Sequence, residues 1–167
     1  MLSKADRWLA RAEELFIAAL ILVASFLLFA NVVARYGFNT AVLGAEELVR
    51  YMIIWLVFIG GSVAARKGIH IGVDAVLSVV GPTIARVISA VVLVFCIGFC
   101  IALAVYGFEL VSATHSFGQR SAALRIPFWI AQVAIPIGAA LMALRFTQRL
   151  IALLQSREDE HKVEMIG

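Results

Sequence analysis

Four long stretches of the chain contain no charged side chain: residues 15–34, 51–65, 87–108 and 126–144. A helix needs about 20 apolar residues to cross the hydrocarbon of a bilayer. Three stretches meet that length, and the second meets it if residues 48–50 are added and Arg50 extends toward the lipid headgroups. None shows the alternation of a barrel strand. The pattern predicts an all-α membrane protein with four transmembrane helices, at about 15–35, 48–65, 86–108 and 126–145.

The remaining segments are short and are assigned around these spans. Residues 2–16 place apolar side chains at helical spacing, which predicts an amphipathic helix that leads into the first span. Residues 69–80 are apolar but too short to cross, so a short lateral amphipathic segment is predicted there. Pro136 lies in the middle of the fourth span and cannot donate to the carbonyl of Gln132, which predicts a kink. Residues 1–154 form one predicted domain, and residues 155–167 a charged cytoplasmic tail.

Composition and charge fix the class and the orientation. Hydrophobic residues make up 63% of the chain and charged residues 15%, whereas soluble proteins contain about 45–50% and about 25%. With four spans, both termini share a side with residues 66–86, and that side carries ten of the fourteen Lys and Arg residues. The positive-inside rule therefore predicts cytoplasmic termini. The net charge of +3 is spread over several membrane-edge segments, so lipids are expected partners and nucleic acid is not.

The middle of every span lacks ionisable side chains. Transporters of charged solutes normally place such groups, or broken helices, near the bilayer midplane. Gln132, beside Pro136, is the one deep amide at a helix irregularity, and helix packing is its favoured role. Gly60 and Ala64 are four residues apart, a spacing that indicates close packing of helices. The chain is therefore predicted to be a poor carrier of charged solutes by itself.

No catalytic, cofactor or metal site is predicted. His70 and His115 fall on opposite sides of the predicted membrane and cannot share one haem iron. Cys96 and Cys100 lie one helical turn apart, and two thiols are too few for a typical structural metal site. The sequence contains no Gly-rich phosphate loop and no nucleophile–base pairing, which argues against an enzyme.

Glu46, Glu47 and Arg50 stand at the edge of the second span. At helical spacing, either carboxylate can form an ion pair with Arg50. Such a pair would mark the membrane boundary. Docking of another chain and binding of a solute are the two other roles that these residues leave open.

Three segments resemble the small membrane subunit of tripartite ATP-independent periplasmic (TRAP) transporters, the DctQ type. They are "ARYGFN" after the first span, "EELVRYMIIWLVFIGGSVAARKGIHIGVD", and "GQRSAALRIPFWIAQVAIPIG". Matching positions in the second segment include Glu46, Glu47, Arg50, Trp55, Gly60, Arg66, His70, Val73 and Asp74. Those in the third are Gly118, Gln119, Ser121, Leu124, Pro127, Trp129, Pro136 and Gly138. The resemblance covers about residues 30–150, and Ala122 departs from it where many members carry proline.

The resemblance implies a multi-pass subunit of the bacterial inner membrane that has no substrate site. Its implied partners are a large, sodium-coupled membrane subunit, which it braces, and a periplasmic substrate-binding protein, which it helps to receive for uptake of an organic acid. Two alternatives stay open: a self-sufficient homo-oligomeric transporter and a membrane anchor of an electron-transfer complex. The substrate stays open among C4-dicarboxylates, sialic acids and other organic acids. The implied docking or membrane-edge residues are Glu46, Glu47, Arg50, Trp55, Arg66, His70, Asp74, Arg120 and Arg125.

Overall fold

The computed structural model of the chain describes residues 4–40, 42–67 and 81–164. Within this part the helices are α1 (Lys4–Gly37), α2 (Ala45–Lys67), α4 (Pro82–Ser116), α5 (Trp129–Gln132) and α6 (Ala134–Glu164). Four helical segments are long and apolar enough to cross a membrane: Arg7–Gly37, Ala45–Arg66, Ile84–Ser116 and Trp129–Gln155. The predicted all-α fold with four spans is confirmed.

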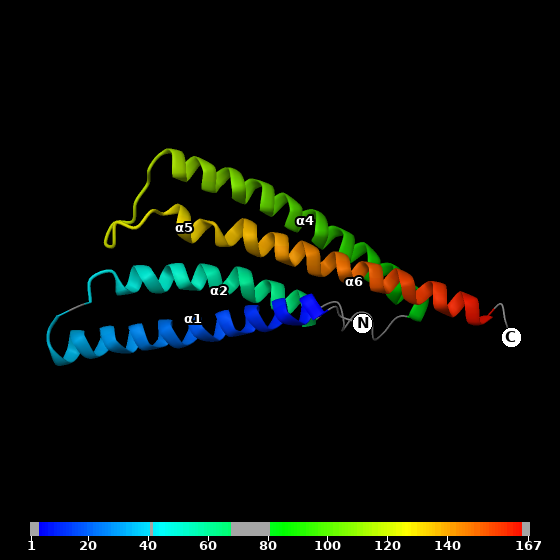
Figure 1. The fold of residues 1–167 in the computed structure, drawn as a ribbon, viewed down its shortest axis with the longest axis horizontal. Coiled ribbons are helices and arrows are strands. Elements are labelled where there is room, and N and C mark those ends of the chain that lie inside the picture. The colour runs from blue at the N-terminus through cyan, green and yellow to red at the C-terminus, as the bar shows by residue number, and fades with distance from the viewer. Residues whose placement is uncertain (1–3, 41, 68–80, 165–167) are drawn as a thin grey trace.

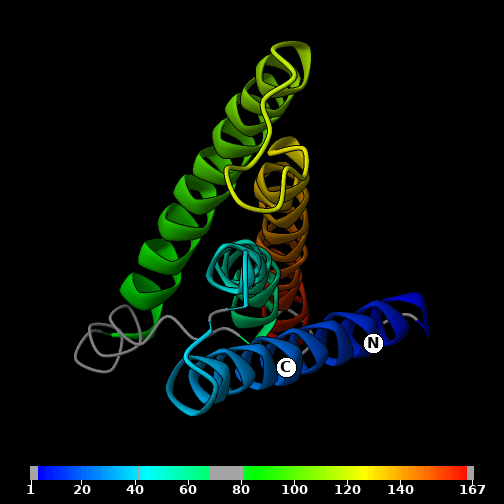
Figure 2. The ribbon, with the colours of Figure 1, turned by 90° about the vertical axis from the view of Figure 1, so that its left-hand side faces the viewer.

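The long helices run along the longest axis of the molecule (Figure 1). The beginnings of α1 and α4 and the ends of α2 and α6 point toward the same side of the molecule, which we call the terminal end. The opposite side, which includes residues 38–40, 42–44 and 117–128, is the loop end (Figure 1). α1 packs on α2, α2 on α6, and α6 on α4, so α2 and α6 are the inner helices (Figure 2). In the most apolar 18-residue segment of each outer helix, the buried share is only 6% for α1 and 11% for α4. The described chain therefore leaves both outer helices largely uncovered.

α1 packs on its neighbour through one narrow stripe. Eight of its ten buried and half-buried positions after residue 6 recur at alternating spacings of three and four residues, the pattern of a left-handed helix pair, and the other two, Leu9 and Ala30, flank members of this series. The stripe consists of Ala10, Glu13, Ile17, Leu20, Ala24, Leu27, Asn31 and Ala34. Its middle is apolar, and its two polar members lie toward opposite ends of the helix. Both of these polar side chains have hydrogen-bond partners on later parts of the chain.

The inner helices approach closely at small residues. A Cβ atom added to Gly138 of α6 would lie 2.7 Å from the carbonyl oxygen of Phe58 on α2. The close approach predicted at Gly60 is not found within the described chain, because a Cβ added there meets no atom within 4 Å. The next residue, Gly61, faces the sulfur of Met142 instead, at 2.8 Å from the added Cβ. The sequence spacing indicated the correct helix but the wrong glycine.

The fourth span is interrupted at Val133, between α5 and α6. The interruption lies one turn before Pro136, which has no N–H to offer the carbonyl of Gln132 and from which the sequence predicted a kink. The helix resumes with a hydrogen bond from the Ile137 N–H to the Val133 carbonyl, at 3.3 Å. α6 then continues to Glu164, so residues 155–164 of the predicted tail extend the helix. The predicted lateral segment 69–80 lies outside the described residues.

Candidate functional site

A carboxylate in the first turn of α2 ties that helix to a distant connection. Acidic side chains are favoured there because the first N–H groups of a helix are unpaired and carry partial positive charge. Glu47 Oε2 accepts hydrogen bonds from the backbone N–H groups of Ala123 and Leu124, at 3.0 and 3.1 Å. Its Oε1 accepts one from the Tyr51 hydroxyl, at 3.0 Å. Glu47 therefore holds the connection between α4 and α5 against α2.

Glu46 joins α2 to α1. Its Oε1 accepts a hydrogen bond from Nη2 of Arg35 at 2.7 Å, and both side chains are more than half exposed. The local ion pairs with Arg50 that helical spacing allows do not form; within the described ranges Arg50 has no ion pair and is exposed. Tertiary partners thus replace the predicted local ones. An exposed pair such as Arg35–Glu46 contributes at most about 1 kcal/mol.

A groove of about 400 Å³ opens at the loop end beside these charges. The ends of α1 and α2 and both loops form its walls, and it is lined by two guanidinium and two carboxylate groups, from Arg35, Arg50, Glu46 and Glu47. Asn31 is also part of the lining. Its Oδ1 accepts a hydrogen bond from the Val42 N–H at 3.0 Å, which ties the connection between α1 and α2 to α1. The groove offers mixed charge at the membrane edge, a surface suited to charged side chains of another protein.

Replacing Glu47 with alanine is expected to loosen the connection between α4 and α5. The amides of Ala123 and Leu124 lose their acceptor, so their hydrogen exchange should become roughly five- to tenfold faster. Exchange followed by mass spectrometry on the full chain measures this. Glu46→Ala is the matched control, because its partner Arg35 lies on α1, and it should leave both amides unchanged. Equal acceleration by the two substitutions would contradict the assignment.

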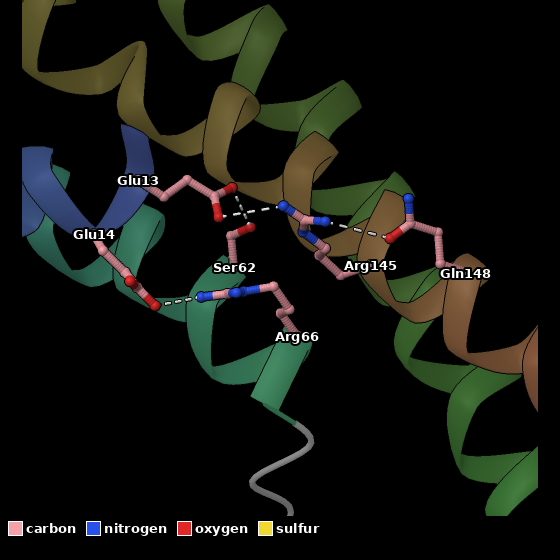
Figure 3. Close-up of polar contacts among 6 residues, drawn as sticks. All are labelled: Glu13, Glu14, Ser62, Arg66, Arg145 and Gln148. Atoms are coloured by element: carbon pink, nitrogen blue, oxygen red, sulfur yellow. Dashed lines mark hydrogen bonds and ion pairs between the residues drawn. The ribbon is translucent and has the colours of Figure 1, made fainter. Parts of the chain in front are cut away.

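Three helices meet at a buried ion pair at the terminal end (Figure 3). Arg145 Nη2 on α6 lies 3.4 Å from Glu13 Oε2 on α1, and the side chains are 1% and 4% exposed. The Ser62 hydroxyl on α2 donates to Glu13 Oε1 at 2.9 Å. Arg145 Nη1 also donates to Oε1 of Gln148, one turn further along α6, at 3.4 Å. A buried charge needs such partners, since desolvation costs several kcal/mol per ion.

A second ion pair lies beside the first (Figure 3). Arg66 Nη2 donates to Glu14 Oε1, and this pair is more exposed, at 23% and 47%. Arg66 was among the predicted membrane-edge residues, whereas Glu13, Glu14 and Arg145 were not singled out. The sequence offered no signal for Glu13, because residues 15–34 are apolar on all sides and the stripe on which Glu13 falls appears only in the burial pattern of the structure.

The other predicted residues are distributed over the loop end and the kink. Trp55 Nε1 donates to the Ile130 carbonyl at 3.2 Å and so links α2 to α5. Arg120 and Arg125 lie exposed in the connection before α5, and Arg120 Nη1 is 3.5 Å from the Arg125 carbonyl oxygen. Oε1 of Gln132 is buried at the kink without a hydrogen-bond partner in the described chain. His70 and Asp74 lie outside the described residues.

The described chain brings together no three His, Cys, Asp or Glu side chains that could hold a metal ion. The two cysteines are free thiols, and Cys100 is buried in a core cluster with Ala65, Leu93 and Phe146. The polar groups of the described chain are thus arranged as ties between helices and as a surface groove.

Comparison with known proteins identifies the chain. Its residues 24–156 match the profile of the family described as tripartite ATP-independent periplasmic transporters, DctQ component. It is 26% identical to the C4-dicarboxylate TRAP transporter small permease protein DctQ of Vibrio cholerae, over 88% of this chain and 73% of that protein. It is 28% identical to the protein of the same name from Rhodobacter capsulatus, over 93% of this chain and 82% of that protein.

A third relative is much longer. The isethionate TRAP transporter permease protein DctMQ of Oleidesulfovibrio alaskensis is 28% identical over 86% of this chain, which corresponds to 24% of that protein. All three relatives are transporter components by name. The family match covers most of the chain, and it includes three of the four helices able to cross a bilayer and the last part of the first. The chain therefore belongs to the DctQ component family of tripartite ATP-independent periplasmic transporters and is a small permease subunit, a multi-pass protein of the inner membrane.

Proposed function

We propose that this subunit is a scaffold that braces a large, sodium-coupled membrane subunit and has neither a solute path nor a catalytic role. The observation that carries the proposal is the position of its charges. Charged side chains near the ends of the spans contact other parts of the chain, as Glu13 does on α6 and Glu47 in the connection before α5, while the middle of each span is apolar. A carrier of a charged solute would need polar groups at that depth.

We infer that the terminal end faces the cytoplasm and the loop end the periplasm. Ten of the fourteen Lys and Arg residues belong to the terminal side, which the positive-inside rule places in the cytoplasm. The groove beside Arg50 then faces the compartment of the soluble binding protein. Mixed charges of this kind speed the encounter with a transient partner and fix its orientation more than they add to tight binding.

The relatives support a partnership with a larger membrane component and a variable substrate. One relative matches this chain over only a quarter of its length, and its name combines DctM with DctQ. The names of the relatives specify C4-dicarboxylate in two cases and isethionate in one. We propose that the transported solute is an organic acid and that the other components select it.

Reconstitution of the separate components tests the scaffold. The full chain should copurify with the large membrane subunit encoded by a neighbouring gene. In liposomes with an inward sodium gradient it should give no uptake alone and full uptake with the large subunit and the binding protein. Gln132→Leu should leave that uptake unchanged, since no solute passes the kink. Uptake by this chain alone that Gln132→Leu abolishes would establish the self-sufficient transporter, and failure to copurify would refute the brace.

The same liposomes test the groove. Arg50→Glu should raise the concentration of binding protein needed for half-maximal uptake about tenfold, because it reverses a charge facing the partner. Arg149→Glu, an exposed arginine of α6 toward the terminal end, is the matched control and should have no effect. Equal effects of the two substitutions would exclude docking at the groove.

A further inference from the structure

An apolar crevice of about 230 Å³ lies on one side of α2, between α1 and α5. Leu20 of α1 and Ile130 of α5 face each other across it, and Leu48 and Trp55 of α2 form its floor. In the described chain α1 packs on α2, and its backbone does not approach those of α5 and α6; the contact of Glu13 with Arg145 of α6 lies nearer the terminal end. This side of α2 therefore has no covering helix, and the crevice is open between the two walls.

The crevice has the depth and the shape of a site for a hydrocarbon chain. Eight of its nine lining residues belong to three of the four spans, and Ile126 lies just before the last span, so the crevice is placed at the depth of the hydrocarbon of the bilayer. From Leu48 to Trp55 it extends about 10 Å along α2, at 1.5 Å per residue. The indole N–H of Trp55 is already bonded to the Ile130 carbonyl, which leaves an apolar surface toward the crevice. An elongated apolar slot at this depth suits an acyl chain better than a single side chain.

Two arginines lie close to this crevice along the chain. Ile126 lines it, and the preceding residue is Arg125, where the apolar span begins. Arg120 is held next to it by a backbone bridge to Pro127 and by its own contact with the Arg125 carbonyl. Both side chains are exposed and form no ion pair within the described chain. Guanidinium groups at a membrane boundary favour phosphate, which they bind through paired N–H donors.

We propose that the crevice is a phospholipid site, with one acyl chain between Leu20 and Ile130 and an anionic phosphate against Arg120 and Arg125. The lipid fills the gap that α1 and α5 leave and holds α1 at its distance from the rest of the bundle. The site does not depend on the scaffold role or on the orientation of the chain. It requires only that the crevice faces lipid, as its position in the spans implies.

Quenching of Trp55 fluorescence by brominated lipid tests the site. The full chain carrying Trp8→Phe and Trp129→Phe retains Trp55 alone, and is reconstituted in phosphatidylcholine with a small fraction of phosphatidylglycerol. Acyl-brominated phosphatidylglycerol should quench Trp55 several-fold more than the same fraction of acyl-brominated phosphatidylcholine, because each arginine contributes roughly a fivefold preference for an anionic headgroup. Leu20→Phe fills the crevice and should abolish the excess. Leu22→Phe is the matched control on the exposed face of α1, where Leu22 is 71% exposed.

Substitutions of the arginines test the headgroup separately and do not alter the core. Arg120→Gln with Arg125→Asn should remove the preference for phosphatidylglycerol; asparagine is chosen because Arg125 has φ of 53°, a backbone conformation that asparagine tolerates. The site is overturned if both brominated lipids quench Trp55 to the same extent. It is also overturned if Leu20→Phe leaves the excess quenching by phosphatidylglycerol unchanged. A preference that survives the double arginine substitution overturns the phosphate contact. Loss of the excess in complex with the large subunit would show that protein occupies the crevice, and would also overturn the proposal.

Discussion

Replacing Arg145 with methionine is expected to lower the free energy of unfolding by about 3–5 kcal/mol. The substitution keeps most of the side-chain volume but leaves the Glu13 carboxylate, only 4% exposed, without its cation. The Ser62 hydroxyl remains as a donor to Glu13, and one neutral hydrogen bond replaces little of a lost charge. Titration of the folded chain in mixed micelles with a denaturing detergent, followed by circular dichroism, measures the change.

Two further variants separate the ion pair from a general loss of packing. Glu13→Leu combined with Arg145→Met removes both charges, so its cost should be smaller than the sum of the single costs, and smaller than that of Arg145→Met alone. Arg66→Met removes the cation of the more exposed neighbouring pair and should cost less than about 1 kcal/mol. Simple additivity of the two single substitutions would contradict a direct interaction between Glu13 and Arg145.

The ion pair sets the position of an outer helix. α1 packs on α2 alone within the described chain, yet Glu13 reaches past α2 to Arg145 on α6. The stripe of α1 is otherwise apolar in its middle and could slide by one turn without exposing charge. Glu13 binds Arg145 and Ser62 near one end of α1, and Asn31 binds the Val42 N–H near the other. Because these partners are lost when α1 slides, we infer that the two residues fix the register of α1, as buried polar residues do in coiled coils.

The number and order of the spans followed from the sequence because apolar length alone decides them. A charge-free run of about 20 residues cannot be accommodated outside lipid or a large core, and a chain of this size has no such core. A helix leading into the first span was predicted over residues 2–16, and α1 is helical from Lys4, the first described residue. The end of the last helix was predicted less well. α6 continues to Glu164, because charged residues continue a helix beyond the hydrocarbon as readily as apolar residues within it. A hydropathy pattern locates only the apolar part of such a helix.

The partners of the charged residues could not be read from local spacing. Glu47 is three residues from Arg50, but it binds amides 76 and 77 residues away. The two unpaired N–H groups of that connection compete for the carboxylate more effectively than an exposed guanidinium, which keeps its hydration. Glu13 and Arg145 are separated by 132 positions. The sequence around Glu13 does not indicate its burial, because the neighbouring charged residues Arg11 and Glu14 are exposed.

Replacing Gly138 with alanine is expected to destabilise the chain by about 3 kcal/mol, at the upper end of the usual cost of overpacking. The added Cβ would lie 2.5 Å from Phe58 Cβ, 2.7 Å from the Phe58 carbonyl oxygen and 2.8 Å from its carbonyl carbon. Backbone atoms cannot rotate away as the end of a side chain can. α2 and α6 would have to separate, and these inner helices connect the two outer ones.

Gly98→Ala in α4 is the matched control for this substitution. A Cβ added to Gly98 meets no described atom within 4 Å, so the same chemical change should be neutral or should stabilise the helix by up to about 1 kcal/mol. Both variants are measured by the same detergent titration, and Gly138→Ala should also weaken copurification with the large subunit if that subunit requires the native spacing of α2 and α6. Similar effects of the two substitutions would mean that helix propensity, and not contact with Phe58, determines the cost. A large effect at Gly138 alone shows that the glycine is needed because two backbones meet there.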